Sequence, residues 1–241
     1  MSEGNRLRCL NRDVIKYIAM FTMLLNHTAH VFLDPESILS AVFTAAGYFT
    51  APVMVYFMVE GYGYTRSKKK YFLRLLLFAA IAQYPYYFAL GFGNLNMLFT
   101  LCLCFGVIWV SKNVENKALR VTAIVLLVFA SAFCDWAFLA PVYTLLMLWA
   151  EGDRRKTAIA YAGAAALFEL FPIAGGLLGF MAGSVLIREL LSVAGVAAAG
   201  VCIVCFYNGR RMERGRTFSK WFFYAFYPAH LLALGILAQV L

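Results

Sequence analysis

The sequence predicts an all-α integral membrane protein, a polytopic bundle of about nine transmembrane helices. Hydrophobic residues make up 63% of the 241 residues and charged residues only 14%, which is more apolar than a water-facing surface tolerates. Apolar segments of roughly spanning length recur along the chain, and basic residues fall between them in a regular alternation. The formal charge of +9 therefore has an explanation in membrane topology, and nucleic acid is not expected as a partner.

The predicted spans belong to a single transmembrane domain over residues 1–241. The polar N-terminus shows no cleavable signal peptide, so the first apolar segment is expected to remain as the first span. Several segments are short, and eight to ten helices are compatible with the pattern. The segments cover about residues 14–33, 39–62, 71–91, 95–111, 119–134, 137–150, 156–171, 188–207 and 219–240.

Basic residues set the expected orientation. With nine crossings, all but one of the 21 Lys and Arg residues lie on the same side, which the positive-inside rule makes cytoplasmic. The protein is then a multi-pass protein of the cell inner (cytoplasmic) membrane, with its N-terminus in the cytoplasm and its C-terminus outside. The basic clusters are 6–16, 66–74, 112–120, 154–156 and 210–220.

The Gly-rich segment near 172–187 is predicted to be re-entrant. A full crossing there would place the basic loop at 208–216 on the outer side, against the alternation. An irregular segment at membrane depth is tolerated where it lines a cavity. Arg188, the one basic residue left over, would then lie with Glu189 in or beside such a cavity.

Polar residues inside the first span are the main functional signal. Lys16 begins the span, and Asn26 and His27 follow it by about three helical turns, roughly 16 Å. Such groups are costly in hydrocarbon, so they indicate a functional site by default. The alternative is that the imidazoles only join neighbouring helices, which suits His30 near the interface. His27 and His30 lack a third ligand and the six cysteines lack metal-site spacing, so no metal is expected.

Further candidates lie in other segments, and each has a simpler alternative. Glu60 ends the second span and could be an interface carboxylate. His230, next to Pro228 in the last span, could relieve a helix kink. Asp135 and Glu169 on the outer side could be solvated acids or could bind a cationic acceptor. The cations Arg66, Lys70 and Arg74 could be topology signals, could contact anionic lipid, or could hold the phosphates of a nucleotide cofactor.

Three stretches resemble the TraX family of membrane acetyltransferases, which is similar to a larger group of membrane acyltransferases. The family pattern usually has Asp before the first-span His, where this chain has Asn26. The larger group has Arg eleven residues before that His, where this chain has Lys16. The stretches are Ile15-Lys-Tyr-Ile-Ala-Met-Phe-Thr-Met-Leu-Leu-Asn-His27, residues 52–74 with Glu60-Gly-Tyr-Gly-Tyr-Thr-Arg66 and Lys70-Tyr-Phe-Leu-Arg74, and Phe223-Tyr-Ala-Phe-Tyr-Pro-Ala-His-Leu-Leu232.

The resemblance implies transfer of an acetyl group from cytoplasmic acetyl-CoA to an amine or hydroxyl of a peptide, protein or glycan, with a pilin N-terminus as the family's acceptor. His27 would act as general base or acyl carrier. Restoring the family's carboxylate by Asn26→Asp is expected to raise activity, whereas lower activity would give Asn26 a role of its own. The implied catalytic residues are Asn26, His27, Glu60 and His230, the CoA-binding residues Lys16, Arg66, Lys70 and Arg74, and the acceptor-binding residues Asp135, Glu169 and Arg188.

A small transporter or channel is the alternative from another functional class. Its polar pathway would use His27, Glu60, Glu169, Arg188 and His230. Transporters often contain repeated halves, and no internal repeat is visible in the sequence. A purely structural membrane subunit is a third alternative, and it predicts that replacing His27 leaves function unchanged.

Overall fold

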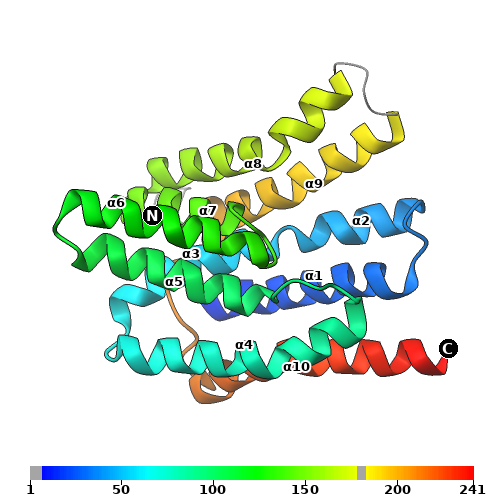
Figure 1. Ribbon diagram of the computed structural model, residues 1–241, viewed down its shortest axis with the longest axis horizontal. Helices are drawn as coiled ribbons and strands as arrows, with labels where there is room; N and C mark the ends of the chain where they lie inside the picture. Colours follow the sequence, from blue (N-terminus) through cyan, green and yellow to red (C-terminus); the bar gives the residue numbers. More distant parts are fainter. Residues whose placement is uncertain (1–6, 178–182) are drawn as a thin grey trace. The chain divides into compact units, whose positions relative to one another are not determined.

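A computed structural model describes residues 7–177 and 183–241, with side chains described except for 169–186. This part of the chain is all-helical, which confirms the predicted fold class (Figure 1). Within the described residues, four helical stretches are long and apolar enough to cross a membrane, and shorter apolar helices accompany them. The four are Ile38–Tyr64, Lys68–Leu90, Ile187–Phe206 and Arg216–Val240.

The chain divides into two compact units, and each draws on two separate stretches of sequence. Unit 1 contains Met1–Met54 and Arg154–Lys220, and unit 2 contains Val55–Asp153 and Trp221–Leu241. Two helices, α3 (Thr50–Tyr64) and α10 (Arg216–Val240), have their first residues in unit 1 and the rest in unit 2. The predicted single domain over 1–241 stays a prediction.

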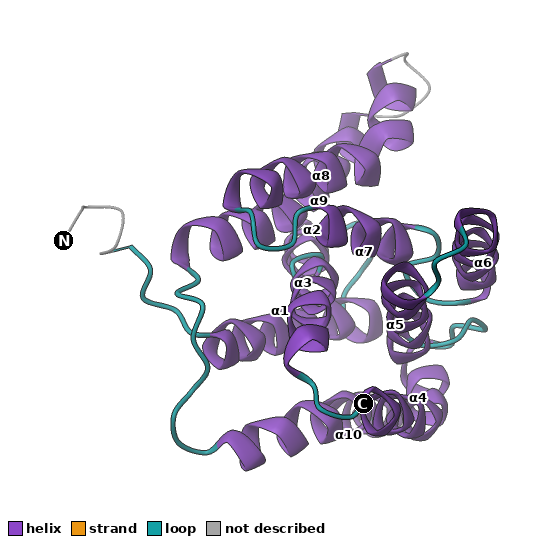
Figure 2. Cartoon of the chain, turned by 90° about the vertical axis from the view of Figure 1, so that its left-hand side faces the viewer, coloured by secondary structure: helices purple, strands orange, loops and turns teal. Residues whose placement is uncertain are grey.

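Unit 1 is built from antiparallel helix pairs. Helix α1 (Arg12–Phe32) packs on α2 (Ile38–Gly47), α2 packs on α9 (Gly183–Val201), and α9 pairs with α8 (Arg154–Leu177) (Figures 1 and 2). A short π-helical turn, η3 (Cys202–Phe206), extends α9. Small residues allow the close packing, since a Cβ at Gly195 would overlap the carbonyl oxygen of Ala45 on α2.

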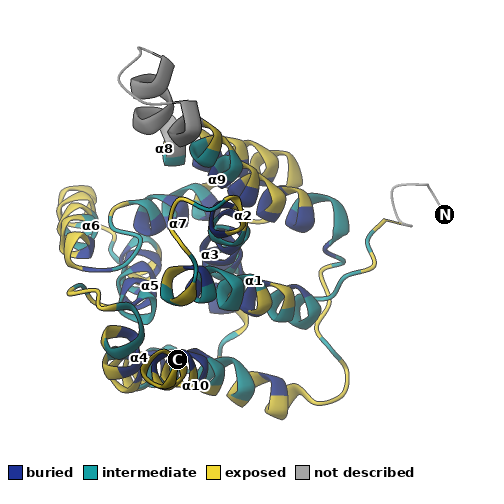
Figure 3. Ribbon diagram, turned by 90° about the vertical axis from the view of Figure 1, so that its right-hand side faces the viewer, coloured by how far each residue is buried: buried dark blue, intermediate teal, exposed yellow. Residues whose placement is uncertain are grey.

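Unit 2 is centred on α5 (Met97–Asn113). This helix packs against α4 (Lys68–Leu90), α6 (Lys117–Ala130) and α7 (Leu139–Trp149), with the 3₁₀ turn η2 (Ser131–Phe133) between α6 and α7. Helix α6 has no buried residue and is largely exposed in Figure 3. Its exposed side chains include Val125, Leu126 and Phe129. Such an apolar exposed surface is what lipid contact requires.

The second predicted span is one helix with a break. Helix α2 ends at Gly47, residues 48 and 49 form a turn, and α3 begins at Thr50. The break lies against α1, where the hydroxyl of Thr50 donates to the carbonyl of Ala19 at 2.7 Å. That hydroxyl also lies 3.1 Å from the hydroxyl of Thr22. Backbone and side-chain polar groups at the break are thus satisfied by the neighbouring helix.

The segment near 172–187 belongs to the hairpin of α8 and α9. Residues 172–177 continue α8, and residues 183–187 begin α9. Within the predicted re-entrant segment near 172–187, residues 178–182 lie outside the described residues. The two flanking parts are helical.

Within each unit, basic segments far apart in the sequence meet at one end, which we call the basic end. In unit 1, the amide of Arg12 donates to the carbonyl of Arg210 at 2.9 Å. In unit 2, Lys112 at the end of α5 pairs with Glu151 after α7 at 2.7 Å. Chain reversals at the helix ends account for this clustering, because consecutive basic loops return to the same end.

Candidate functional site

Helix α1 carries the first predicted group of site residues. It is continuous from Arg12 to Phe32, so Lys16 and His27 share one helix with about 16 Å of axial rise between them. The imidazole of His27 is buried, with 8% of its surface exposed. His30, one turn later, is exposed. Burial therefore distinguishes the two histidines, and His27 is the one held inside unit 1.

Lys16 belongs to a charged cluster at the basic end of unit 1. Arg12, Asp13 and Arg211 all lie within electrostatic range of its ammonium group. Asp13 fixes the loop that supplies Arg211, since one carboxylate oxygen accepts from the amide of Met212 at 2.8 Å. The other oxygen accepts from the hydroxyl of Ser219 at 2.8 Å. Three cations and one carboxylate form a positively charged surface suited to an anion.

Asn26 joins α1 to α2. Its amide nitrogen donates to the carbonyl of Thr44 at 3.0 Å. A Cβ at Gly47 would overlap the side chain of Asn26, so the two helices approach closely at this point. The contact uses the amide as a hydrogen-bond donor, which a carboxylate cannot do. Asn26 therefore has a structural role of its own in addition to its place before His27.

Asn26→Asp should lower stability and activity. The carboxylate would lose the hydrogen bond to Thr44 and place two acceptors against each other, at a cost of about 1–3 kcal/mol. Thermal unfolding in detergent measures the change. Asn116→Asp is the matched control, because Asn116 caps α6 by accepting from the amide of Leu119, a role that Asp performs equally well. An Asn26→Asp protein as stable as the parent and more active would contradict this role.

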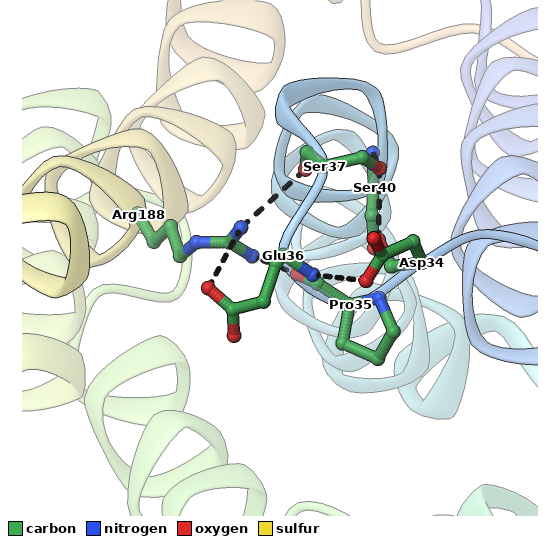
Figure 4. A network of polar contacts seen from close by, with 6 residues as sticks. All are labelled: Asp34, Pro35, Glu36, Ser37, Ser40 and Arg188. Carbon is green, nitrogen blue, oxygen red and sulfur yellow. Dashed lines mark hydrogen bonds and ion pairs between the residues drawn. The ribbon is translucent and has the colours of Figure 1, made fainter.

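Arg188 lies at the start of α9 and holds the loop between α1 and α2 (Figure 4). Its guanidinium donates to the carbonyl of Pro35 and, at 3.5 Å, to that of Ser37. The carboxylate of Glu36 lies 3.9 Å away and is 85% exposed. Arg188 and Glu36 line a cavity of about 130 Å³ together with Ile38, Ala41, Ile187 and Leu191.

A cation–aromatic cluster occupies the basic end of unit 2. The ammonium groups of Lys68 and Lys112 lie 4.4 and 5.7 Å from the centroid of the Tyr62 ring. Lys68 also donates to the carbonyls of Tyr62 and Thr65, which caps the end of α3. Because Lys112 pairs with Glu151, these two lysines stabilise the helix ends. Arg66 and Lys70, by contrast, are exposed at the same end.

Arg74 lies one turn further along α4, in an aromatic setting. Its guanidinium interacts electrostatically with the phenol of Tyr224 on α10, a helix that runs beside α4 (Figure 2). Tyr224 stacks on Phe78 with ring centroids 4.9 Å apart, and Trp221 lies 6.4 Å from both rings. The Nε donor of Arg74 is buried without a hydrogen-bond partner among the described residues. A buried unused donor is costly, and an anion would satisfy it.

His230 lies in the middle of α10, inside unit 2. Its Nδ1 lies 2.8 Å from the carbonyl oxygen of Phe226. Because a carbonyl only accepts, Nδ1 carries the proton and Nε2 carries the lone pair of the neutral ring. The ring stacks on Phe226 at 4.7 Å and lies 5.8 Å from Tyr227. Glu60 lies on α3, also in unit 2, and is half-buried.

Asp135 lies in the loop between η2 and α7, at the end of unit 2 opposite the basic end. The loop is fixed by Leu95, which donates to the carbonyl of Phe133 at 2.8 Å and accepts from the amide of Asp135 at 2.7 Å. The carboxylate accepts from the amide of Trp136 at 2.9 Å. Burial raises the pKa of Asp135 to about 6, and the Trp136 amide opposes that shift.

Two amides, those of the buried Asn96 and the half-buried Gln83, support the neighbouring turn and were not among the predicted site residues. Asn96, fully buried, donates to the carbonyl of Ala79 at 2.8 Å and to the side chain of Gln83 at 2.9 Å. Gln83 in turn donates to the carbonyl of Asn94 at 3.0 Å. Both residues fall within predicted apolar segments, 71–91 and 95–111. A polar side chain in such a segment is the sequence feature that could have indicated them.

The structure therefore groups the predicted residues by unit. Lys16, Asn26, His27 and Arg188 belong to unit 1, with Arg188 near the end of α1 opposite Lys16. A second set, Glu60, Arg66, Lys70, Arg74, Asp135 and His230, belongs to unit 2. Glu169 is on α8, and its side chain lies outside the described residues. Among the described residues, no three His, Cys, Asp or Glu side chains gather to hold a metal ion.

These features define the class: an all-helical, multi-pass membrane protein whose spans carry buried histidines and basic clusters at one end of each unit. The chain belongs to the TraX protein family, whose model matches residues 11–238. It is 30% identical over 236 residues to the probable fimbrial assembly protein FimC, serogroup H1, of Dichelobacter nodosus, covering 91% of this chain and 92% of that protein. No solved structure matches.

Proposed function

We propose that the protein is a membrane acetyltransferase that moves an acetyl group from cytoplasmic acetyl-CoA to an amine or hydroxyl of an exported peptide or protein. Membership of the TraX family supports the reaction class. The relative's name, a probable fimbrial assembly protein, supports a pilin-like acceptor. The basic ends of the units face the cytoplasm in this proposal, as the positive-inside rule requires.

The observation that carries the proposal is the setting of Arg74. A cation that only signals topology lies at the surface with its donors in water. Arg74 is half-buried, interacts electrostatically with the phenol of Tyr224, and has a buried Nε donor without a hydrogen-bond partner among the described residues. A guanidinium presents a planar fork that matches phosphate oxygens. Lys70 lies four residues earlier on the same face of α4, and Arg66 precedes that helix.

Each part of acetyl-CoA has matching groups in this proposal. The cations Arg66, Lys70 and Arg74 hold the phosphates, and the rings of Trp221 and Tyr224 offer apolar surface to the adenine or the pantetheine arm. Lys16 adds positive charge at the basic end of unit 1. The acetyl thioester itself needs no metal, because a neutral imidazole can remove the proton from an attacking amine or hydroxyl.

His27 is the proposed base. The acceptor nitrogen or oxygen attacks the thioester carbonyl, His27 takes the acceptor's proton, and the C–S bond breaks. The imidazolium then returns the proton to the CoA thiolate. His27 could instead attack the thioester itself and carry the acetyl group to the acceptor. His230 and Glu60, which belong to unit 2, are also proposed as catalytic residues.

Acetyl-CoA binding to the purified protein in detergent tests the proposal. Calorimetry should detect binding of acetyl-CoA, weaker binding when the 3′-phosphate is removed, and much weaker binding of acetyl-pantetheine, which carries no phosphate. Slow release of free CoA should accompany binding, since water can replace a missing acceptor. A protein that binds none of the three compounds would refute the acetyltransferase, and equal binding of all three would refute the phosphate site.

A further inference from the structure

The loop that carries Asp135 is held in a strained conformation. Trp136 and Phe138 have φ angles of 55° and 59°, in the left-handed region that bulky side chains avoid. Such residues cost of order 1–3 kcal/mol each and persist where the surrounding structure imposes them. Here the imposing contacts are the pairing with Leu95 and the hydrogen bond that the Phe138 amide donates to the Ser131 hydroxyl at 2.9 Å. Strain of this kind marks a loop whose shape serves something other than stability.

The carboxylate of Asp135 is half-buried and has few polar partners among the described residues. One hydrogen bond, from the Trp136 amide, reaches it. The neighbouring titratable groups are Cys134 on the same loop, Tyr86 on α4 and Tyr227 on α10. All three are neutral or negative, and no cation is among the described groups that shift its pKa. A partly desolvated anion with no countercharge among the described groups favours a bound cation or a proton.

The groups around this carboxylate suit an organic ammonium ion. Tyr86 and Tyr227 lie within electrostatic range of Asp135, and Trp136 follows it directly. Aromatic faces attract ammonium groups, especially where water is excluded. The side chain of Tyr227 is buried, with 4% of its surface exposed. An inorganic metal ion would want several oxygen ligands, and the described residues offer no such group here.

We propose that Asp135 binds the protonated amine of the acceptor and removes its proton before acetyl transfer. The inference rests on the proposed function and adds a catalytic residue to it. The N–H bond breaks and an O–H bond forms on Asp135, which leaves a neutral amine with a lone pair. That lone pair attacks the thioester carbonyl: the C–N bond forms, the C–S bond breaks, and the electron pair leaves on the CoA sulfur.

Protons balance over the cycle. The attacking nitrogen still carries one excess proton, which a general base takes and returns to the CoA thiolate. The proton on Asp135 goes to water when the site is free again. The net reaction converts acetyl-CoA and an alkylammonium ion into an amide, CoA thiol and one proton. A carboxyl pKa of about 6 suits this exchange, since the group is ionised near neutral pH and still basic enough to take a proton.

The test compares Asp135→Asn with the parent on two acceptors that differ by one atom. Alaninamide offers an amine, and lactamide offers a hydroxyl in the same place. Asp135→Asn should lower kcat/KM at least tenfold for alaninamide and less than twofold for lactamide, and should remove the limb near pH 6 from the pH profile with the amine. Acetyl-CoA binding should not change. Asp153→Asn, in a loop of the same unit, is the control and should behave as the parent.

A stability measurement separates this inference from the proposed function. The pKa of Asp135 is higher in the folded protein than the ordinary 3.8, so ionisation weakens folding as the pH rises through about 6. Asp135→Asn should therefore melt at a higher temperature than the parent at pH 7.5, and the gain should vanish near pH 4. Alaninamide should raise the melting temperature of the parent but not of the variant.

The outcomes are distinct. A protein that binds no acetyl-CoA but shows the amine-dependent melting shift would refute the acetyltransferase and retain Asp135 as an ammonium site. Equal losses on both acceptors, a lower melting temperature at pH 7.5, or weaker acetyl-CoA binding in Asp135→Asn would assign Asp135 a structural role and overturn the inference. Transfer by the parent to lactamide alone would overturn it as well.

Discussion

Replacing His27 with alanine should lower acetyl transfer at least 100-fold while leaving acetyl-CoA binding unchanged. General base catalysis by a positioned side chain contributes about 10² to 10⁴ in rate, and His27 is a buried imidazole on a continuous helix. The base acts on the acceptor, so the dissociation constant of acetyl-CoA should stay within about twofold. Steady-state kinetics and calorimetry measure the two quantities on the same preparation.

His30→Ala is the matched control for that experiment. It removes the same side chain one turn later on α1, from an exposed position, and it should retain most of the activity. His27→Gln keeps much of the volume and a hydrogen-bond donor but cannot take a proton, so it should be as inactive as His27→Ala. An active His27→Gln protein would mean that His27 only packs or hydrogen-bonds, as a structural subunit would require.

A chemical trap separates the two proposed roles of His27. An acyl carrier would leave radioactive acetyl on the protein after incubation with labelled acetyl-CoA and rapid quenching without acceptor, whereas a general base would leave none. In the carrier case, added imidazole should restore part of the activity of His27→Ala by carrying acetyl in solution. No restoration and no label together would assign His27 to proton transfer.

The helices could be predicted closely from the sequence because every span must contain an apolar segment long enough to cross the bilayer. The first apolar segment was expected at about 14–33 and forms Arg12–Phe32, and the third was expected at about 71–91 and forms Lys68–Leu90. The break at residues 48 and 49 could not be predicted. It depends on the Thr50 hydroxyl reaching the Ala19 carbonyl of another helix, and hydropathy does not record such a contact.

The candidate site residues were recognisable by type, and their partners were not. Asn26 stood out as a polar residue before His27, yet its partner, the Thr44 carbonyl, is a backbone group that no motif identifies. Lys68 belonged to a basic run that looked uniform, although it caps α3 and differs in role from the exposed Lys70. A pattern of charged residues in the sequence indicates where a basic surface lies. Only the packed structure shows which of those charges already have partners within the protein.

Arg74→Ala should weaken acetyl-CoA binding about 10- to 100-fold, since charge-assisted bonds to phosphate are worth about 1.5–3 kcal/mol each. The acetyl-CoA affinity of Arg74→Lys should lie between those of the parent and Arg74→Ala, because lysine keeps the charge and loses the planar fork. Tyr224→Phe should weaken binding about threefold to tenfold, because it removes the hydroxyl that orients the guanidinium.

Comparing ligands with and without phosphate shows whether Arg74 contacts a phosphate directly. Arg74→Ala should leave the weak binding of acetyl-pantetheine unchanged, because that compound has no phosphate for the guanidinium to contact. Lys69→Ala removes the same charge from an exposed position in the first turn of α4, and there screening by solvent and salt keeps the effect of the lost charge small. If Lys69→Ala weakened acetyl-CoA binding as much as Arg74→Ala, the general field of the basic end would hold the cofactor. A loss confined to Arg74→Ala and to the phosphorylated compounds would require direct contact between this guanidinium and a phosphate.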